Sequence, residues 1–181
     1  MKEIEVKAQL NNKETVLQEL EKLGCVLSEP ITQIDTVYAK IVGSVSEYAK
    51  NDHFLRIREK SDGRYIFTVK ADPTKHALVK TEHETEILNP VEMRKAIFLM
   101  GYHIANKLTK IRQIGHYKDY EICVDEVEGL GSFIEVEKIS DEDPEIVLTE
   151  LKKLLFTLGI LPEDETKKGY DIMVIEKEMV G

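Results

Sequence analysis

Charged side chains recur at alternate positions in several segments of this 181-residue chain. Within the first ten residues, Glu3, Glu5 and Lys7 alternate with apolar residues. Because successive side chains of a strand point to opposite faces, these three lie on one face, roughly 7 Å apart at each step. One such row is also typical of an ordinary solvent-facing strand. Its repetition elsewhere in the chain favours a chemical role.

The same spacing returns in four further segments, as the pairs Arg56 and Arg58, Glu84 and Glu86, Lys110 and Arg112, and Glu135 and Glu137. Lys70 and Asp125 are predicted to lie on two further strands, at residues 64–71 and 117–127. If these strands close into a barrel, the charges meet around a lumen, where each buried ion needs a partner. A triphosphate with Mg²⁺ or Mn²⁺ is such a partner, because Arg and Lys bind phosphoryl oxygens and carboxylates bind these metals.

Length and composition restrict the possible classes of protein. We expect residues 1–181 to form a single domain that needs no disulfide or structural metal. The formal net charge of −9 argues against general nucleic-acid binding. Cys25 and Cys123 form no disulfide framework, and neither a signal peptide nor a membrane span is visible. A cytoplasmic location is therefore predicted.

The apolar spacing and the turn residues predict an α+β fold. We expect helices at residues 13–23, 90–100, 144–158 and 168–179, with glycines ending the first three. Strands are predicted at residues 1–10, 25–40, 53–59, 64–71, 79–88, 103–115, 117–127 and 132–139. Polar residues 43–52 and 72–78 are predicted to be loops that could act as lids. Together these elements suggest about eight antiparallel strands with helices packed outside.

The ordered series of charged motifs closely resembles the CYTH superfamily, which is named for its adenylyl cyclase and thiamine triphosphatase members. The motifs are Glu3-x-Glu5-x-Lys7, Leu55-Arg56-Ile57-Arg58, Val69-Lys70, Glu84-x-Glu86, Lys110-x-Arg112, Asp125 and Glu135-x-Glu137. The resemblance implies a closed eight-stranded antiparallel β-barrel with helices packed outside, which forms a tunnel that holds a triphosphate and a divalent metal. It implies triphosphate binding by Lys7, Arg56, Arg58, Lys70, Lys110 and Arg112. It also implies metal binding by Glu3, Glu5, Glu135 and Glu137, supported by Glu84, Glu86 and Asp125.

Residues 127–137, together with Asp125, look like the class IV adenylyl cyclase branch. That branch converts ATP to cyclic AMP and pyrophosphate and implies a possible homodimer. The alternative is a triphosphatase that attacks thiamine triphosphate, tripolyphosphate or a nucleotide with water. Lys7 paired with Tyr38 could orient that water, although Tyr38 could equally be a packing residue, and Tyr170 resembles part of a C-terminal family motif. A third hypothesis is that the protein binds polyphosphate or nucleotide without catalysis.

One position departs from the family pattern. The resemblance implies a basic residue two positions before Glu84, whereas this chain has Glu82. Lys80 could substitute for the missing base. The phosphate contacts of this strand are the part of the site that the resemblance defines least.

Overall fold

The computed structural model describes residues 2–71 and 79–180 of the chain. This part contains nine strands and five α-helices, and none of its helices is both long and apolar enough to cross a membrane. The strands are β1 (Lys2–Gln9), β2 (Ile31–Ala39), β3 (His53–Lys60), β4 (Tyr65–Ala71), β5 (Val79–Glu86), β6 (His103–Tyr117), β7 (Tyr120–Val127), β8 (Gly131–Ser140) and β9 (Glu165–Thr166). The helices are α1 (Lys13–Lys22), α2 (Val45–Tyr48), α3 (Pro90–Leu99), α4 (Pro144–Thr157) and α5 (Tyr170–Val180), with a 3-10 turn at Pro162–Asp164.

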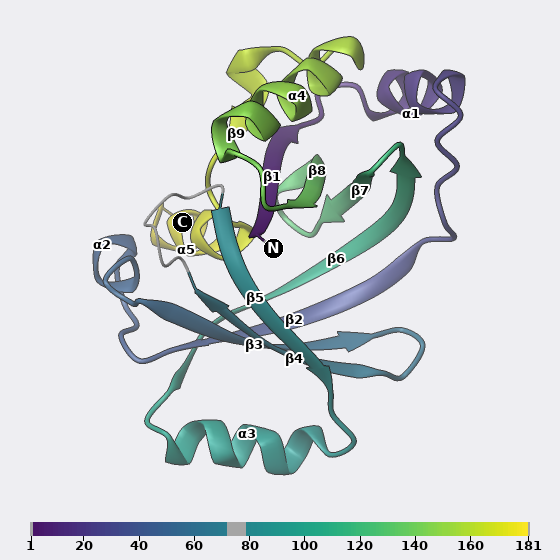
Figure 1. Cartoon of the computed structure of the whole chain (residues 1–181). Coiled ribbons are helices and arrows are strands. Elements are labelled where there is room, and N and C mark those ends of the chain that lie inside the picture. The colour runs from purple at the N-terminus through teal and green to yellow at the C-terminus, as the bar shows by residue number, and fades with distance from the viewer. Residues whose placement is uncertain (1, 72–78, 181) are drawn as a thin grey trace.

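All described strands belong to one antiparallel sheet that curves strongly (Figure 1). Its order is β5-β4-β3-β2-β6-β7-β8-β1-β9, and β1 also pairs with β5. That last pairing involves two residue pairs, whereas β1 and β8 share eight. The α+β class and the antiparallel sheet are confirmed. A barrel closed along its whole length is not established, and the short strand β9 was not expected.

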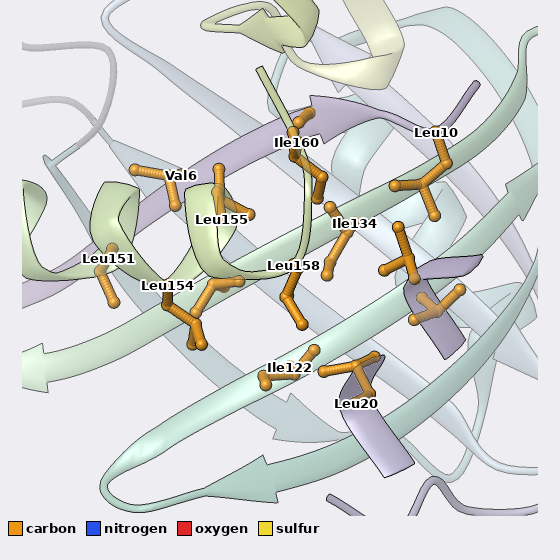
Figure 2. Packing of buried hydrophobic residues seen from close by; sticks show 14 of the residues in the cluster. Val6, Leu10, Leu20, Ile122, Ile134, Leu151, Leu154, Leu155, Leu158 and Ile160 are labelled. Atoms are coloured by element: carbon orange, nitrogen blue, oxygen red, sulfur yellow. The ribbon is translucent and has the colours of Figure 1, made fainter. Parts of the chain in front are cut away.

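The largest core lies on the outer face of β1, β7 and β8, under α1 and α4. In Figure 2, Leu151 and Leu155 of α4 point towards the sheet, which contributes Val6, Ile122 and Ile134. Each of these strand residues alternates with a charged neighbour, so burying one face directs the charges to the other face. The outer core therefore fixes which side of the sheet carries the ionisable groups.

Helix ends follow the expected capping chemistry. Asn12 accepts a hydrogen bond from the backbone N–H of Thr15 at the start of α1, and Asp143 caps α4 in the same way. Gly24 (φ 78°) and Gly159 (φ 80°) follow α1 and α4 in the left-handed conformation that glycine adopts without strain. The predicted helix boundaries are accordingly correct to within about two residues.

The last helix occupies a place that the sequence did not indicate. Instead of covering the outer face, α5 packs against Leu108, Val127 and Phe133. Each of these lies two positions from a charged residue of the inner face, Lys110, Asp125 and Glu135 respectively, and therefore shares its face of the strand. Figure 1 places α5 beside the concave side of the sheet. The helix therefore covers one end of the inner face.

Residues 43–52, expected to form a loop, include helix α2. Ser44 and Glu47 form a capping box at its start. At its end, Tyr48 stacks on Phe54 with ring centroids 4.6 Å apart, and its hydroxyl donates to the Asp171 carboxylate of α5. This segment is thus attached to α5. The other predicted loop, residues 72–78, lies outside the described residues.

Replacing Leu151 with alanine tests the outer core. Leu151 is fully buried between α4 and the sheet, so Leu151→Ala should lower the free energy of unfolding by about 2 to 5 kcal/mol. Phe156→Ala on the same helix is the control, because that side chain is 69% exposed. It should cost less than about 1 kcal/mol. Urea denaturation followed by circular dichroism measures both, and equal losses would contradict this packing.

Candidate functional site

The concave side of the sheet, here called the inner face, gathers the charged residues of β1 to β8. Ion pairs link side chains of neighbouring strands, and Lys70 of β4 lies 4.0 Å from Glu3 of β1, which is not its neighbour in the sheet order. Each of the six predicted phosphate ligands has an acidic partner here. The pairs are Lys7–Glu135, Arg56–Glu84, Arg58–Asp35, Lys70–Glu82, Lys110–Asp125 and Arg112–Asp125.

The centre of the inner face is a buried network on β6, β7 and β8. Asp125 is fully buried and accepts hydrogen bonds from Lys110 Nζ at 3.0 Å and from Arg112 Nε at 2.7 Å. Arg112 also donates to Glu135. Burial and the neighbouring Arg112 lower the pKa of Lys110 to about 8. The Asp125 carboxylate therefore positions two cations that the sequence predicted to bind phosphate.

A second pair links β2 and β3. Arg58 donates from Nε and Nη2 to the two carboxylate oxygens of Asp35, at 2.7 and 2.8 Å. Burial alone would raise the pKa of Asp35, but the adjacent Arg58 guanidinium holds it well below its usual range. Such a bidentate pair fixes the guanidinium plane. Asp35 therefore orients Arg58.

Acids of β5 accompany the cations of β3 and β4. Arg56 Nη2 donates to Thr68 at 3.1 Å and to Glu84 at 2.8 Å. Lys70 forms an ion pair with Glu82, which lies directly opposite it in the β4–β5 ladder. Burial would favour the neutral amine, but the carboxylates of Glu5, Glu82 and Glu3 outweigh it and raise the pKa of Lys70.

Lys7 lies where the sheet meets α5. Its Nζ is 3.0 Å from Glu135 and donates to the backbone carbonyl of Lys168 at 3.4 Å. The ring of Tyr170 faces Lys7 Nζ at 4.2 Å and Lys110 Nζ at 5.0 Å from its centroid. These are cation–π contacts. The structure therefore brings Lys7 and Tyr170 together, as part of the wall that α5 forms.

Three acids converge at one side of the inner face. Carboxylate oxygens of Glu3, Glu5 and Glu137 lie within 4.8 Å of one another, and Glu5 and Glu137 are directly opposite in the β1–β8 ladder. Burial, and then the charges of Glu3 and Glu121, raise the pKa of Glu137 to about 8. Close carboxylates that resist ionising together are stabilised by a divalent cation, and oxygen ligands suit Mg²⁺ or Mn²⁺. The residues present fit such an ion.

The remaining predicted metal ligands lie elsewhere. Glu135 and Asp125 pair with cations of the buried network, and Glu84 pairs with Arg56. Glu86 is exposed near the end of β5. Of the seven predicted acids, three thus form the carboxylate cluster, three are counterions of the cations, and Glu86 belongs to neither group.

Of the two hypotheses for Tyr38, the one that pairs it with Lys7 is contradicted. Tyr38 is fully buried on the outer face, packed with Leu55, Ile57 and Ile97. Its ring contacts Phe98 of α3 edge-on, with centroids 6.0 Å apart. The other reading of Tyr38, as a packing residue, is the one that the structure supports.

Sequence reasoning missed several members of the inner face. Asp35 is not among the predicted site residues, and Glu82 was noted only as a departure from the family pattern. Glu121 lies opposite Glu137 in the β7–β8 ladder and helps to raise its pKa. The sequence contained a signal for Glu82, because it shares the alternate-position spacing of Glu84 and Glu86. The partners of Asp35 and Glu121 depend instead on the register between strands.

The chain is similar to a known protein family and to a named relative over nearly its whole length. A sequence model of the CYTH domain matches residues 1–170. A Methanocaldococcus jannaschii protein named "Putative adenylate cyclase MJ0240" is 33% identical over 174 residues, covering 94% of this chain and 97% of that protein. The match extends over nearly the whole length of both chains.

Solved structures share the fold. The PH1819 protein from Pyrococcus horikoshii OT3 aligns with a TM-score of 0.81 at 26% identity, covering 97% of this chain and 99% of that one. HpAC1 from Hippeastrum aligns with a TM-score of 0.61 at 17% identity, covering 98% and 95%. HpAC1 is described as an adenylyl cyclase candidate with a dominant triphosphatase activity. At that identity the likeness shows the fold alone.

Metal binding at the carboxylate cluster should depend on pH. Because the pKa of Glu137 is about 8, the cluster carries a proton at neutral pH that a divalent cation must displace. Mg²⁺ affinity should therefore rise by up to about tenfold per pH unit below pH 8 and level off above it. Calorimetric titration at several pH values measures this slope.

The matched control is Glu137→Gln, whose amide does not titrate in this range. In this variant the pH dependence should largely disappear, together with much of the affinity. A wild-type affinity that stays constant from about pH 6 to pH 8 would remove Glu137 from the ligand set.

Proposed function

The chain belongs to the CYTH domain family, and from this we propose that it converts ATP to cyclic AMP and pyrophosphate with the aid of a divalent metal ion. The observation that carries the proposal is the carboxylate cluster of Glu3, Glu5 and Glu137 on the same face as six buried or partly buried cations. Carboxylates for a metal beside guanidinium and ammonium groups are the components that phosphoryl chemistry requires.

The sheet is proposed to close around the triphosphate as a tunnel. The pairing of β1 with β5 at Glu3 and Ile4 supports this, since it joins strands from opposite parts of the sheet order. Helix α5 covers one end of the inner face, so the substrate would enter from the other end. Removing water in this way strengthens each charge contact with the phosphates.

The cations are proposed to bind phosphoryl oxygens while retaining part of their present contacts. The bidentate contact with Asp35 uses Nε and Nη2 of Arg58, and a guanidinium has five N–H donors in all. Arg112, held by Asp125 and Glu135, has the same capacity. Lys7 and Lys110 face the ring of Tyr170, which would hold both ammonium groups in place without competing as a hydrogen-bond acceptor.

The carboxylate cluster would hold Mg²⁺ or Mn²⁺ beside these cations. A bound divalent ion would supply positive charge that stabilises the charge developing on the phosphates. Glu3 and Glu5 project from one strand and Glu137 from its neighbour, so the sheet itself fixes their spacing. The ion is therefore proposed to bind to a largely preformed site.

Cyclisation is chosen over hydrolysis because the Methanocaldococcus jannaschii relative, at 33% identity, carries an adenylate cyclase name. Hydrolysis of thiamine triphosphate, tripolyphosphate or a nucleoside triphosphate is the second candidate. It is favoured by the triphosphatase activity described for HpAC1, whose likeness is one of fold. The single domain, the homodimer and the cytoplasmic location stay predictions.

The products of the reaction test the proposal. Incubation with Mg²⁺ or Mn²⁺ and ATP should give equal amounts of cyclic AMP and pyrophosphate, which ion-exchange chromatography separates. Parallel incubations contain thiamine triphosphate or tripolyphosphate. Orthophosphate without cyclic AMP would instead support the triphosphatase, and no product from any of the three would contradict an enzyme.

Glu3→Gln tests the carboxylate cluster separately from the cations. Losing one metal ligand should lower metal-dependent turnover by about 100-fold or more. The control is Glu126→Gln, which removes the same charge from an exposed residue that pairs with Lys13. Initial rates at saturating ATP compare the two variants, and near wild-type turnover by Glu3→Gln would exclude Glu3 as a ligand.

A further inference from the structure

We propose that Glu82 is a specificity-determining residue, which makes the site favour organic triphosphate esters over inorganic tripolyphosphate. This inference rests on the proposed triphosphate chemistry and narrows its substrate class. Glu82 lies on β5 with its side chain 12% exposed. It pairs with Lys70 of β4, and it also lies 3.7 Å from Arg56 Nη2 of β3. One carboxylate thus faces two proposed phosphate ligands.

Burial distinguishes Glu82 from the next acid on the same face. Glu84 also pairs with Arg56, but its side chain is 48% exposed, so water screens much of its charge. The charge of Glu82 acts in a poorly hydrated setting, where electrostatic effects reach further. The charge of Glu82 therefore affects the binding of an anionic ligand at this part of the inner face more strongly than the charge of Glu84 does.

The surroundings of Glu82 are rich in acids. Lys70 and Arg56 carry positive charge there, and three carboxylates, those of Glu5, Glu82 and Glu3, act on Lys70 together. When Glu3 and Glu5 hold a metal ion, Glu82 remains as the counterion of Lys70. A phosphate that approaches Lys70 then meets a cation whose charge is already balanced.

The two substrate classes differ in total charge. Tripolyphosphate has a terminal phosphate with two ionisable oxygens at each end, and bound Mg²⁺ favours its fully ionised form at pH 8. In an organic triphosphate, the ester bond replaces one of these ionisable oxygens, and the ligand carries one negative charge fewer. A buried carboxylate beside the phosphate ligands penalises that additional charge, so Glu82 favours the ester.

The test compares binding of two unreactive ligands at pH 8 in saturating Mg²⁺. They are the diimido analogues of ATP and of tripolyphosphate, in which P–NH–P bridges resist both cyclisation and hydrolysis. The wild type should bind the ATP analogue more tightly. Glu82→Gln should strengthen tripolyphosphate binding by about tenfold relative to the ATP analogue, as expected for removing one nearby charge. Calorimetry gives both dissociation constants.

Three further variants separate charge from structure. Glu82→Ala, also neutral, should shift the ratio of the two affinities in the same direction, whereas Glu82→Asp should keep the wild-type ratio. Glu126→Gln, at an exposed site, should leave the ratio unchanged. Thermal unfolding confirms that each variant is folded before its ratio is used.

The outcomes also separate this inference from the proposed function. Binding of the ATP analogue by the wild type, with an unchanged ratio in both neutral Glu82 variants, overturns the specificity role and leaves the proposed function standing. If the affinities for both ligands change equally, Glu82 has a structural role, and the specificity role is likewise overturned while the proposed function stands. Failure of the wild type to bind either analogue overturns both.

Discussion

Charge neutralisation on the inner face is the constraint on which the rest of the structure depends. Asp125 is fully buried and Lys110 is 3% exposed, and taking such ions out of water costs several kcal/mol each, on the order of the stability of a whole domain. The cost is met because acid and base lie directly opposite each other in the ladders. Lys7 faces Glu135, Arg58 faces Asp35, and Arg112 faces Asp125. Strand register thus sets the electrostatics.

That register is in turn fixed by the outer face. A shift of one residue in β8 would turn Ile134 and Val136 inward and expose Glu135 to the α4 core. Such a shift would cost free energy on both faces of the sheet, because an apolar contact outside and an ion pair inside would be lost together. The helices outside the sheet therefore position the charged groups inside it, although α1, α3 and α4 contribute no member of the inner-face pairs described above.

Much of this arrangement was predictable because it follows from local rules. Alternation identified the strands, and caps such as Asn12 and Asp143 marked the helix starts. The position of Tyr38 was also constrained, since it lies three residues from Asp35 and must point to the opposite face. Which face was the inner one, however, depended on where the helices pack. The placement of α5 and the partners of Asp35 required contacts between residues far apart in sequence, which no local pattern encodes.

The paired state of the cations has a consequence for the proposed function. A triphosphate that draws Lys70 or Lys7 towards its oxygens weakens the contacts of Glu82 or Glu135, and a buried carboxylate without a counterion is costly. Substrate binding alone is therefore opposed by the acids that keep the site stable beforehand. A metal ion held by Glu3, Glu5 and Glu137 would reduce this cost, because it would lie beside Lys70. Its positive charge would compensate the carboxylates when Lys70 turns towards the phosphate. The metal ion and the triphosphate are expected to favour each other's binding for this reason, and the acids of the inner face link the two.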